Sequence, residues 1–195
     1  MALINVNFRE LKVLIVDDSR TARSIVKEVL DAISVNQVKM AEDGADAMAR
    51  LREFPADIVL CDLHMAPLDG IEFTRLLRSA DDSPNPYLPV LMLTADATER
   101  QVKNAFAAGV NDFMSKPVEM AALRRKLRAL FSKPLVFLRD GRYLKPLRGG
   151  GHANGATTKV AEEPAPSPAP EVEIIDYSIP GVEPVTRADM GLKGA

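Results

Sequence analysis

Three carboxylates, one hydroxyl and one ammonium group stand directly after short apolar runs of this 195-residue chain. They belong to Asp17, Asp18, Asp62, Thr94 and Lys116. Carboxylates that gather in one place repel one another, and a bound cation usually neutralises them. A few hard oxygen ligands suit Mg²⁺, which keeps waters and accepts phosphate oxygens. A lysine and a threonine beside such an ion could bind a phosphoryl group.

Each of these residues also has an ordinary structural explanation when it is taken alone. An Asp or Ser after a strand, as in Asp17-Asp18-Ser19, often caps the next helix. A lone Asp such as Asp62 is a common turn residue. The combination is more informative than its parts, because the residues meet only if the apolar runs lie side by side.

Short apolar runs alternate with amphipathic segments over the first two thirds of the chain. The runs are rich in Val, Ile, Leu and Met and show little alternation, which is typical of strands buried on both faces of a parallel sheet. They are Lys12–Val16, Gln37–Ala41, Ile58–Cys61, Val90–Leu93 and Asp112–Met114. The amphipathic segments predict helices over Ser19–Ala32, Gly44–Glu53, Gly70–Ser79, Thr98–Ala108 and Glu119–Phe131.

This alternation of strands and helices predicts an α/β fold, a (βα)5 doubly wound parallel five-stranded sheet with helices on both faces. Such sheets bind ligands beyond the carboxyl ends of their strands. The polar residues named above would therefore meet at that edge.

Composition excludes several other classes of protein. Hydrophobic residues make up 47% of the chain, which is enough for a folded core. No stretch approaches the roughly 18 apolar residues of a membrane helix, and residues 1–10 lack the apolar centre of a secretory signal. A net charge of −2 argues against nucleic acid as the main ligand. The single cysteine, Cys61, lies in an apolar run and fits a reducing compartment, so we expect a cytoplasmic protein with no membrane contact.

With these residues in place, the chain resembles the receiver domain of two-component response regulators, the CheY-like family. The resemblance rests on Asp17-Asp18, Asp62, Thr94-Ala95 and Lys116-Pro117, and it covers roughly residues 11–131. It implies a flavodoxin-like fold with strand order 2-1-3-4-5. It also implies a signalling phosphoprotein, not an enzyme, whose only chemistry is its own phosphorylation and dephosphorylation.

The resemblance implies a role for each residue of the set. Asp62 matches the phosphoacceptor, Asp18 a direct Mg²⁺ ligand, and Asp17 a ligand that acts partly through water. Thr94 matches the residue that hydrogen-bonds the phosphoryl group. Lys116 matches the cation that pairs with that group, in a cis Lys116-Pro117 peptide bond.

Three further positions follow from the same resemblance. Phe113 matches the aromatic switch that turns inward when Thr94 moves. The backbone carbonyl of His64 falls where the family coordinates Mg²⁺, and the side chains of His64 and Asp96 fall where the family modulates loss of the phosphoryl group. The family often has Met-Pro after the phosphoacceptor, whereas Pro67 comes one place late here, so we expect a loop of different shape.

The end of the chain differs in composition, since seven of its 14 prolines and seven of its 11 glycines lie after residue 145. We expect three parts: a receiver domain at 9–133, a basic extension at 134–148, and a Gly/Pro-rich disordered tail at 149–195. No sustained helix or strand pattern is visible beyond Phe131, although Leu135–Leu138 could be a short extended segment. The acidic and apolar patch Glu171–Tyr177 could dock a partner or fold back on the basic cluster.

The resulting hypothesis is a phosphorylation switch, or a shuttle in a phosphorelay. Its expected partners are a sensor histidine kinase or a histidine phosphotransfer protein, and a downstream protein that binds around Thr98–Ala108 and Glu119–Phe131. A phosphorylation-dependent dimer is a further expectation. Two alternatives stay open: a DNA-binding regulator using the basic stretch from Arg124 to Arg148, and a phosphorylation-independent adaptor. A phosphatase-like hydrolase is disfavoured because the first strand lacks an Asp-x-Asp pair.

Overall fold

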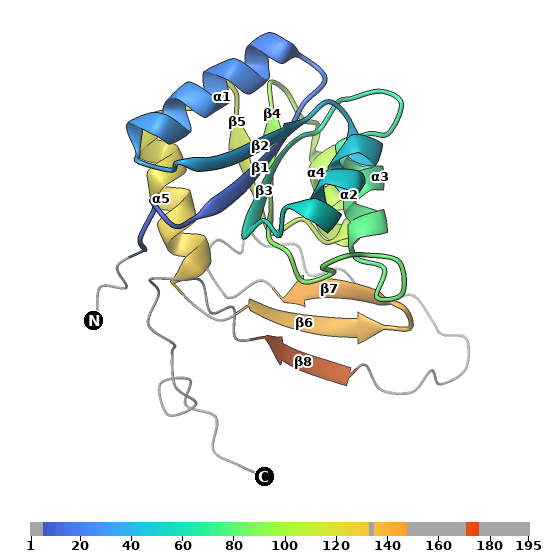
Figure 1. Ribbon diagram of the computed structural model, residues 1–195. Helices are drawn as coiled ribbons and strands as arrows, with labels where there is room; N and C mark the ends of the chain where they lie inside the picture. The colour runs from blue at the N-terminus through green and yellow to red at the C-terminus, as the bar shows by residue number, and fades with distance from the viewer. Residues whose placement is uncertain (1–5, 133–134, 148–170, 176–195) are drawn as a thin grey trace.

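The computed structural model describes residues 6–132, 135–147 and 171–175 (Figure 1). Its main sheet is parallel, with strand order β2-β1-β3-β4-β5, and it confirms the predicted α/β class and order. The strands are β1 (Lys12–Val16), β2 (Gln37–Ala41), β3 (Ile58–Asp62), β4 (Val90–Thr94) and β5 (Asp112–Ser115). No helix in these parts of the chain is long and apolar enough to span a bilayer.

Helices cover both faces of this sheet (Figure 1). One face packs against α1 (Arg20–Ala32) and α5 (Met120–Phe131). The other packs against α2 (Gly44–Glu53), α3 (Gly70–Leu77) and α4 (Glu99–Ala108). Because side chains alternate along a strand, β1 contributes to two separate cores, with Val13 and Ile15 in the first and Leu14 and Val16 in the second.

The expectation that all five strands are buried on both faces is wrong for the two outer ones. Strands β3 and β4 are buried along their whole length, whereas β2 and β5 lie at the sheet edges and expose part of each. Gln37 and Lys39 of β2 are exposed, while Val38 and Met40 are half-buried against the α1 side of the sheet. An edge strand has only one neighbour, so half of its backbone groups face outward.

The predicted helix ends are confirmed where they could be read from capping residues. The Ser19 hydroxyl accepts a hydrogen bond from the Ala22 amide, and Thr98 and Gln101 form a capping box at the start of α4. Gly109 ends α4 with φ 105°, a left-handed conformation that favours glycine.

A second sheet follows α5, and it corrects the expectation that no strand pattern exists beyond Phe131. Strands β6 (Leu135–Asp140) and β7 (Tyr143–Leu147) form an antiparallel hairpin, and β8 (Glu171–Ile175) pairs with the other edge of β6. Within the expected patch Glu171–Tyr177, the described residues Glu171–Ile175 therefore fold back on β6, where Glu171 pairs with Arg139 of the basic cluster. The remaining residues of the expected 149–195 tail lie outside the described residues.

This small sheet packs beneath the amino ends of β4 and β5, away from the carboxyl edge where ligands bind (Figure 1). Phe137 and Leu144 are completely buried there. The Leu144 amide donates to the Arg78 carbonyl at 3.0 Å, and the Phe137 ring meets the Tyr87 ring edge-on at 5.4 Å.

Candidate functional site

Three carboxylates converge at the carboxyl edge of the parallel sheet, as the sequence predicted. Asp17 and Asp18 follow β1, and Asp62 ends β3, the neighbouring strand. One carboxylate oxygen from each lies within 4.8 Å of the others. Asp17 and Asp62 are buried, whereas Asp18 is exposed, so the cluster opens to solvent on one side.

Lys116 joins this cluster from the end of β5. Its Nζ donates to Asp17 Oδ2 at 2.6 Å and lies 2.8 Å from Asp62 Oδ1. Its amide donates to the Thr94 carbonyl at 2.7 Å, and the Lys116-Pro117 peptide bond is cis, as expected. Asp17, Asp18, Asp62 and Lys116 are called the acidic site below.

The electrostatics of the acidic site follow from burial and from one cation shared by two acids. Burial raises the pKa of Asp62, and the hydrogen bond and charge of Lys116 only partly oppose it. Burial would lower the pKa of Lys116, but hydrogen bonds to Asp17 and Asp62 outweigh it and raise that pKa. The two shifts therefore have different causes: burial raises the pKa of Asp62, whereas the two carboxylates around the ammonium raise the pKa of Lys116.

The residues of the acidic site fit a small divalent cation. Asp17, Asp18 and Asp62 offer carboxylate oxygens, two of these three acids are buried, and Asp18 is exposed to water. Mg²⁺ prefers this kind of set, with one or two protein carboxylates and several waters.

Glycine at position 70 lets helix α3 begin directly against the acidic site. A Cβ atom at Gly70 would collide with the backbone carbonyl of Asp62 and with Met92 Sδ. The start of α3 is fixed by a capping box between Asp69 and Glu72. This close approach holds the end of β3, and hence Asp62, in place.

Thr94 ends β4 next to Lys116, and Phe113 belongs to the neighbouring strand β5. The Thr94 hydroxyl donates to the Asp96 carbonyl at 2.6 Å. Phe113 is half-buried, and its ring meets Phe106 of α4 edge-on with 4.9 Å between centroids. In this arrangement the threonine hydroxyl is committed to the β4–α4 loop.

His64 contacts α4 through a residue that the sequence reasoning missed. Its Nε2 lies 2.8 Å from Gln101 Nε2. The Gln101 Oε1 atom already accepts from the amide and the hydroxyl of Thr98, so the Gln101 nitrogen donates and His64 Nε2 accepts. The Thr-x-x-Gln capping pattern was the available signal, but nothing in it points to His64.

Arg23 is a second residue that the sequence reasoning missed. Its Nη1 donates to the carbonyls of Asp17 and Asp18, at 2.6 and 3.3 Å. The Asp17 carboxylate also accepts from the Ser19 amide at 2.9 Å. Arg23 lies one turn into α1 and holds the β1–α1 loop through these two carbonyls. In the sequence alone it looks like any other cation on the exposed face of a helix.

Comparison with known proteins identifies the family. The model of the response regulator receiver domain matches residues 13–128. The chain is 38% identical over 132 residues to the chemotaxis protein CheY-3 of Vibrio cholerae, and the matched region covers 68% of this chain and 98% of that protein. It is 35% identical over 123 residues to CheY of Pseudomonas aeruginosa, covering 63% and 98%.

Solved structures agree with this assignment. CheY4 of Vibrio cholerae superposes with a TM-score of 0.56 at 28% identity, over 61% of this chain and 97% of that one. The receiver domain of a sensor histidine kinase from Pseudomonas aeruginosa, with a magnesium ion coordinated in its active site cleft, has a TM-score of 0.56 at 27% identity, over 63% and 98%. The fold and the acidic site define a receiver domain, and the chain belongs to the response regulator receiver family.

Proposed function

We propose that Asp62 is the phosphoacceptor through which this receiver domain signals. The observation that carries the proposal is the position of its carboxylate between two other acids and one lysine. One of its oxygens lies within 4.8 Å of one oxygen of Asp17 and one of Asp18, and Lys116 Nζ lies 2.8 Å from Asp62 Oδ1. A nucleophilic carboxylate beside a cation-binding cluster and an ammonium group is suited to phosphoryl transfer.

In the proposed transfer, a carboxylate oxygen of Asp62 attacks the phosphorus of a phosphohistidine on a partner protein. The O–P bond forms as the P–N bond breaks, and the electron pair of the broken bond stays on the imidazole nitrogen. Hydrolysis later adds water to the phosphorus, which returns the Asp62 carboxylate and inorganic phosphate. These two steps are the whole chemistry of the protein, so we class it as a signalling protein and not as an enzyme.

Asp17, Asp18 and Asp62 would hold Mg²⁺, with the backbone carbonyl of His64 as a further ligand. When bound, the ion neutralises charge on the oxygens of the transferred phosphoryl group. Lys116 already bonds Asp17 and Asp62, so it is positioned to pair with a phosphoryl oxygen while it keeps its bond to Asp17.

Thr94 and Phe113 form the proposed switch. The Thr94 hydroxyl donates to the Asp96 carbonyl, and a phosphoryl group on Asp62 would offer it a charged acceptor instead. Transfer of this hydrogen bond would release the β4–α4 loop and open space for the Phe113 ring, which now packs on Phe106. A ligand-dependent bond of this kind biases a two-state equilibrium toward the phosphorylated conformation.

His64 and Asp96 are the proposed modulators of phosphoryl lifetime. The support for His64 is its bond to Gln101, which holds the β3–α3 loop against the start of α4. His64 lies two residues after Asp62, so an imidazole held in this way would affect how water approaches an acyl phosphate on Asp62.

The partners of this domain are a sensor histidine kinase or a histidine phosphotransfer protein, and a downstream protein that reads α4, β5 and α5. A phosphorylation-dependent dimer would use the same face, and the protein would act in the cytoplasm. No observation favours a DNA-binding role, since Lys126 and Lys145 of the basic stretch are paired with Asp112 and Asp140 at 2.6 and 2.7 Å.

The test uses beryllofluoride, a phosphoryl mimic, with Mg²⁺ and amide NMR spectra of the full chain. Wild-type protein is expected to shift at the acidic site and along α4 and β5, while Asp62→Asn stays unchanged. Asp31→Asn makes the same chemical change at an exposed acid of α1 and is expected to respond like the wild type. A silent wild type, or an equal response from Asp62→Asn, would contradict the proposal.

A further inference from the structure

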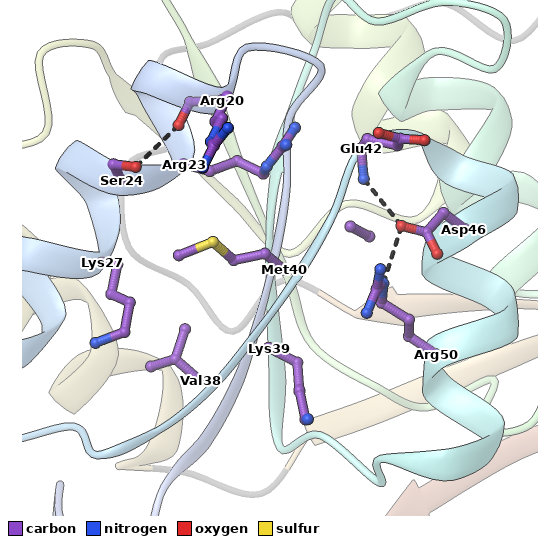
Figure 2. Close-up of a pocket in the computed structure, with 11 residues that line it drawn as sticks. Arg20, Arg23, Ser24, Lys27, Val38, Lys39, Met40, Glu42, Asp46 and Arg50 are labelled. Carbon is purple, nitrogen blue, oxygen red and sulfur yellow. Dashed lines mark hydrogen bonds and ion pairs between the residues drawn. The ribbon is translucent and has the colours of Figure 1, made fainter.

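The side of the molecule opposite β5 carries a groove that the phosphorylation chemistry does not use. The groove has a volume of about 460 Å³ and follows the edge strand β2 between α1 and α2 (Figure 2). Its floor contains the half-buried side chains of Val38 and Met40. Five cationic and two acidic residues belong to its lining: Arg20, Arg23, Lys27, Lys39, Arg50, Glu42 and Asp46.

The cations of this groove differ in how far they are already committed. Lys27 pairs with Asp31 at 2.7 Å, and Arg50 pairs with Asp46 at 2.9 Å. Within the described part of the chain, the side chains of Arg20 and Lys39 make no hydrogen bond or ion pair, and both are exposed. They come from α1 and from β2 itself, so a ligand lying along the strand would meet positive charge from both (Figure 2).

The backbone of β2 offers hydrogen-bonding groups to the same groove. Among the described strands, β2 pairs only with β1. The Ala41 carbonyl accepts a hydrogen bond from the Asp17 amide and so faces β1. The backbone groups of the alternate residues Lys39 and Gln37 face β1 as well. The amides and carbonyls of Val38 and Met40 therefore point to the open edge, where a further strand could pair with them.

We propose that this groove binds an extended acidic peptide of a partner protein, which adds to the edge of β2 as a sixth strand. Strand addition supplies backbone hydrogen bonds, while pockets beside the edge choose the side chains. Beside the β2 edge lie the apolar floor of Val38 and Met40 and the cations Arg20 and Lys39, which are unpaired among the described residues. These neighbours fit a segment that mixes apolar and acidic residues. An acidic partner is also favoured by charge complementarity, since cations outnumber acids along the groove.

A nucleic acid fits the groove less well. A peptide can place an apolar residue opposite Glu42, which is exposed and makes no ion pair within the described residues, whereas a phosphate backbone carries a charge at every nucleotide. It would also leave the outward amides of β2 and the apolar floor unused.

The groove reaches the acidic site through one shared residue. Arg23 lines the groove and donates to the carbonyls of Asp17 and Asp18. A bound peptide would therefore lie directly beside the β1–α1 loop. The binding itself needs no phosphorylation, so the test below stands whether or not Asp62 accepts a phosphoryl group.

The experiment measures fluorescence anisotropy of a labelled peptide, about seven residues long, that alternates Glu and Val, titrated with the full chain. Three further probes are compared with it: a Lys-Val peptide, the Glu-Val peptide with every backbone amide methylated, and a single-stranded oligonucleotide. We expect saturable binding of the unmodified Glu-Val peptide. Methylation removes the strand-pairing donors of both peptide edges and should weaken binding about tenfold or more.

Two charge reversals localise the binding. Lys39→Glu combined with Arg20→Glu should weaken the Glu-Val peptide by about tenfold or more, since like charges then face it. Arg124→Glu combined with Arg125→Glu makes the same double change at exposed positions of α5 and should alter affinity by no more than about twofold. Equal binding of the methylated peptide, tighter binding of the oligonucleotide, or an equal loss in the α5 variant would each overturn the proposal.

Discussion

Two cationic side chains, one half-buried and one fully buried, stand at opposite ends of the parallel sheet, and they are held in different ways. Lys116, after β5, bonds two carboxylates of the acidic site. Arg78, at the end of α3, is 1% exposed and donates to neutral oxygens: the carbonyls of Pro86, Leu88 and Gly109 and the Asn111 side chain.

The difference follows from the two head groups. A guanidinium is a rigid, planar fork that is always charged, so several fixed carbonyls can satisfy it permanently. An ammonium is a compact point charge on a flexible stem, and it can exchange one acidic oxygen for another. Arg78 thus suits a structural joint, and Lys116 suits a site whose charge changes.

The Arg78 joint predicts the largest loss of stability. Arg78→Met should lower the free energy of unfolding by about 4 kcal/mol, because several buried oxygens lose their donor and each orphaned group costs about 1–3 kcal/mol. Urea denaturation checks this. Arg75→Met, at an exposed position of the same helix, should change it by no more than about 0.5 kcal/mol. A loss of unfolding free energy below about 1 kcal/mol in Arg78→Met would contradict the structural role given to Arg78.

The small sheet should stabilise the receiver through Phe137. Phe137→Ala removes a fully buried ring that packs on Tyr87 and lies 5.5 Å from the Arg78 guanidinium, so we expect a loss of about 3 kcal/mol. Tyr143→Ala, at an exposed ring of β7, should cost about 1 kcal/mol or less. The beryllofluoride response of Phe137→Ala should persist where the protein is folded. Equal losses in the two variants would mean that the sheet is not packed as described.

Lys116 should show the opposite pattern, with a small effect on stability and a large one on switching. In Mg²⁺, Lys116→Met should lower the free energy of unfolding by less than about 2 kcal/mol, since the metal can neutralise the same carboxylates. Its affinity for beryllofluoride should fall about tenfold or more. Lys103→Met, an exposed lysine paired with Glu99 on α4, is the control and should bind normally. Full beryllofluoride affinity in Lys116→Met would contradict the role given to this ammonium.

The His64–Gln101 contact should give the smallest effect. His64→Ala and Gln101→Ala should each change the rate of dephosphorylation, and their effects should be non-additive by about 0.5–1 kcal/mol, or about two- to fivefold in rate. Loss of phosphoryl label from the protein measures this. Arg100→Ala, the exposed neighbour on α4, should be additive with His64→Ala. If His64→Ala and Gln101→Ala were also additive, the His64–Gln101 contact would have no part in setting the dephosphorylation rate.

The core of the fold and the acidic site could be predicted from sequence because both depend on local patterns. Continuous apolar runs mark β1, β3 and β4, and the residue after each strand is carried to the same edge by the topology. Asp17, Asp62 and Lys116 meet for that reason, although Lys116 lies 99 residues from Asp17.

The rest depends on contacts that no local pattern carries. Strand β8 pairs with β6 although more than thirty residues of sequence separate the paired positions. The sequences of these edge strands mix polar and apolar residues without a clear alternation. Arg78 reads as one more surface cation of a helix until the folded chain brings Gly109 and Asn111 around it. Gln101 was missed in the same way, because its partner His64 comes from another loop. Arg23 was missed because it binds a backbone carbonyl, which any residue could supply.

The central claim is that Asp62 accepts a phosphoryl group at a metal-dependent acidic site. Its most direct test is intact-mass spectrometry after incubation with a small phosphodonor and Mg²⁺, followed by peptide mapping. The account predicts that wild-type protein gains one phosphoryl group on the peptide that contains Asp62, that chelation of Mg²⁺ prevents the gain, and that Asp62→Asn gains none. A phosphoryl group on another residue, or an equal gain in Asp62→Asn, would contradict it.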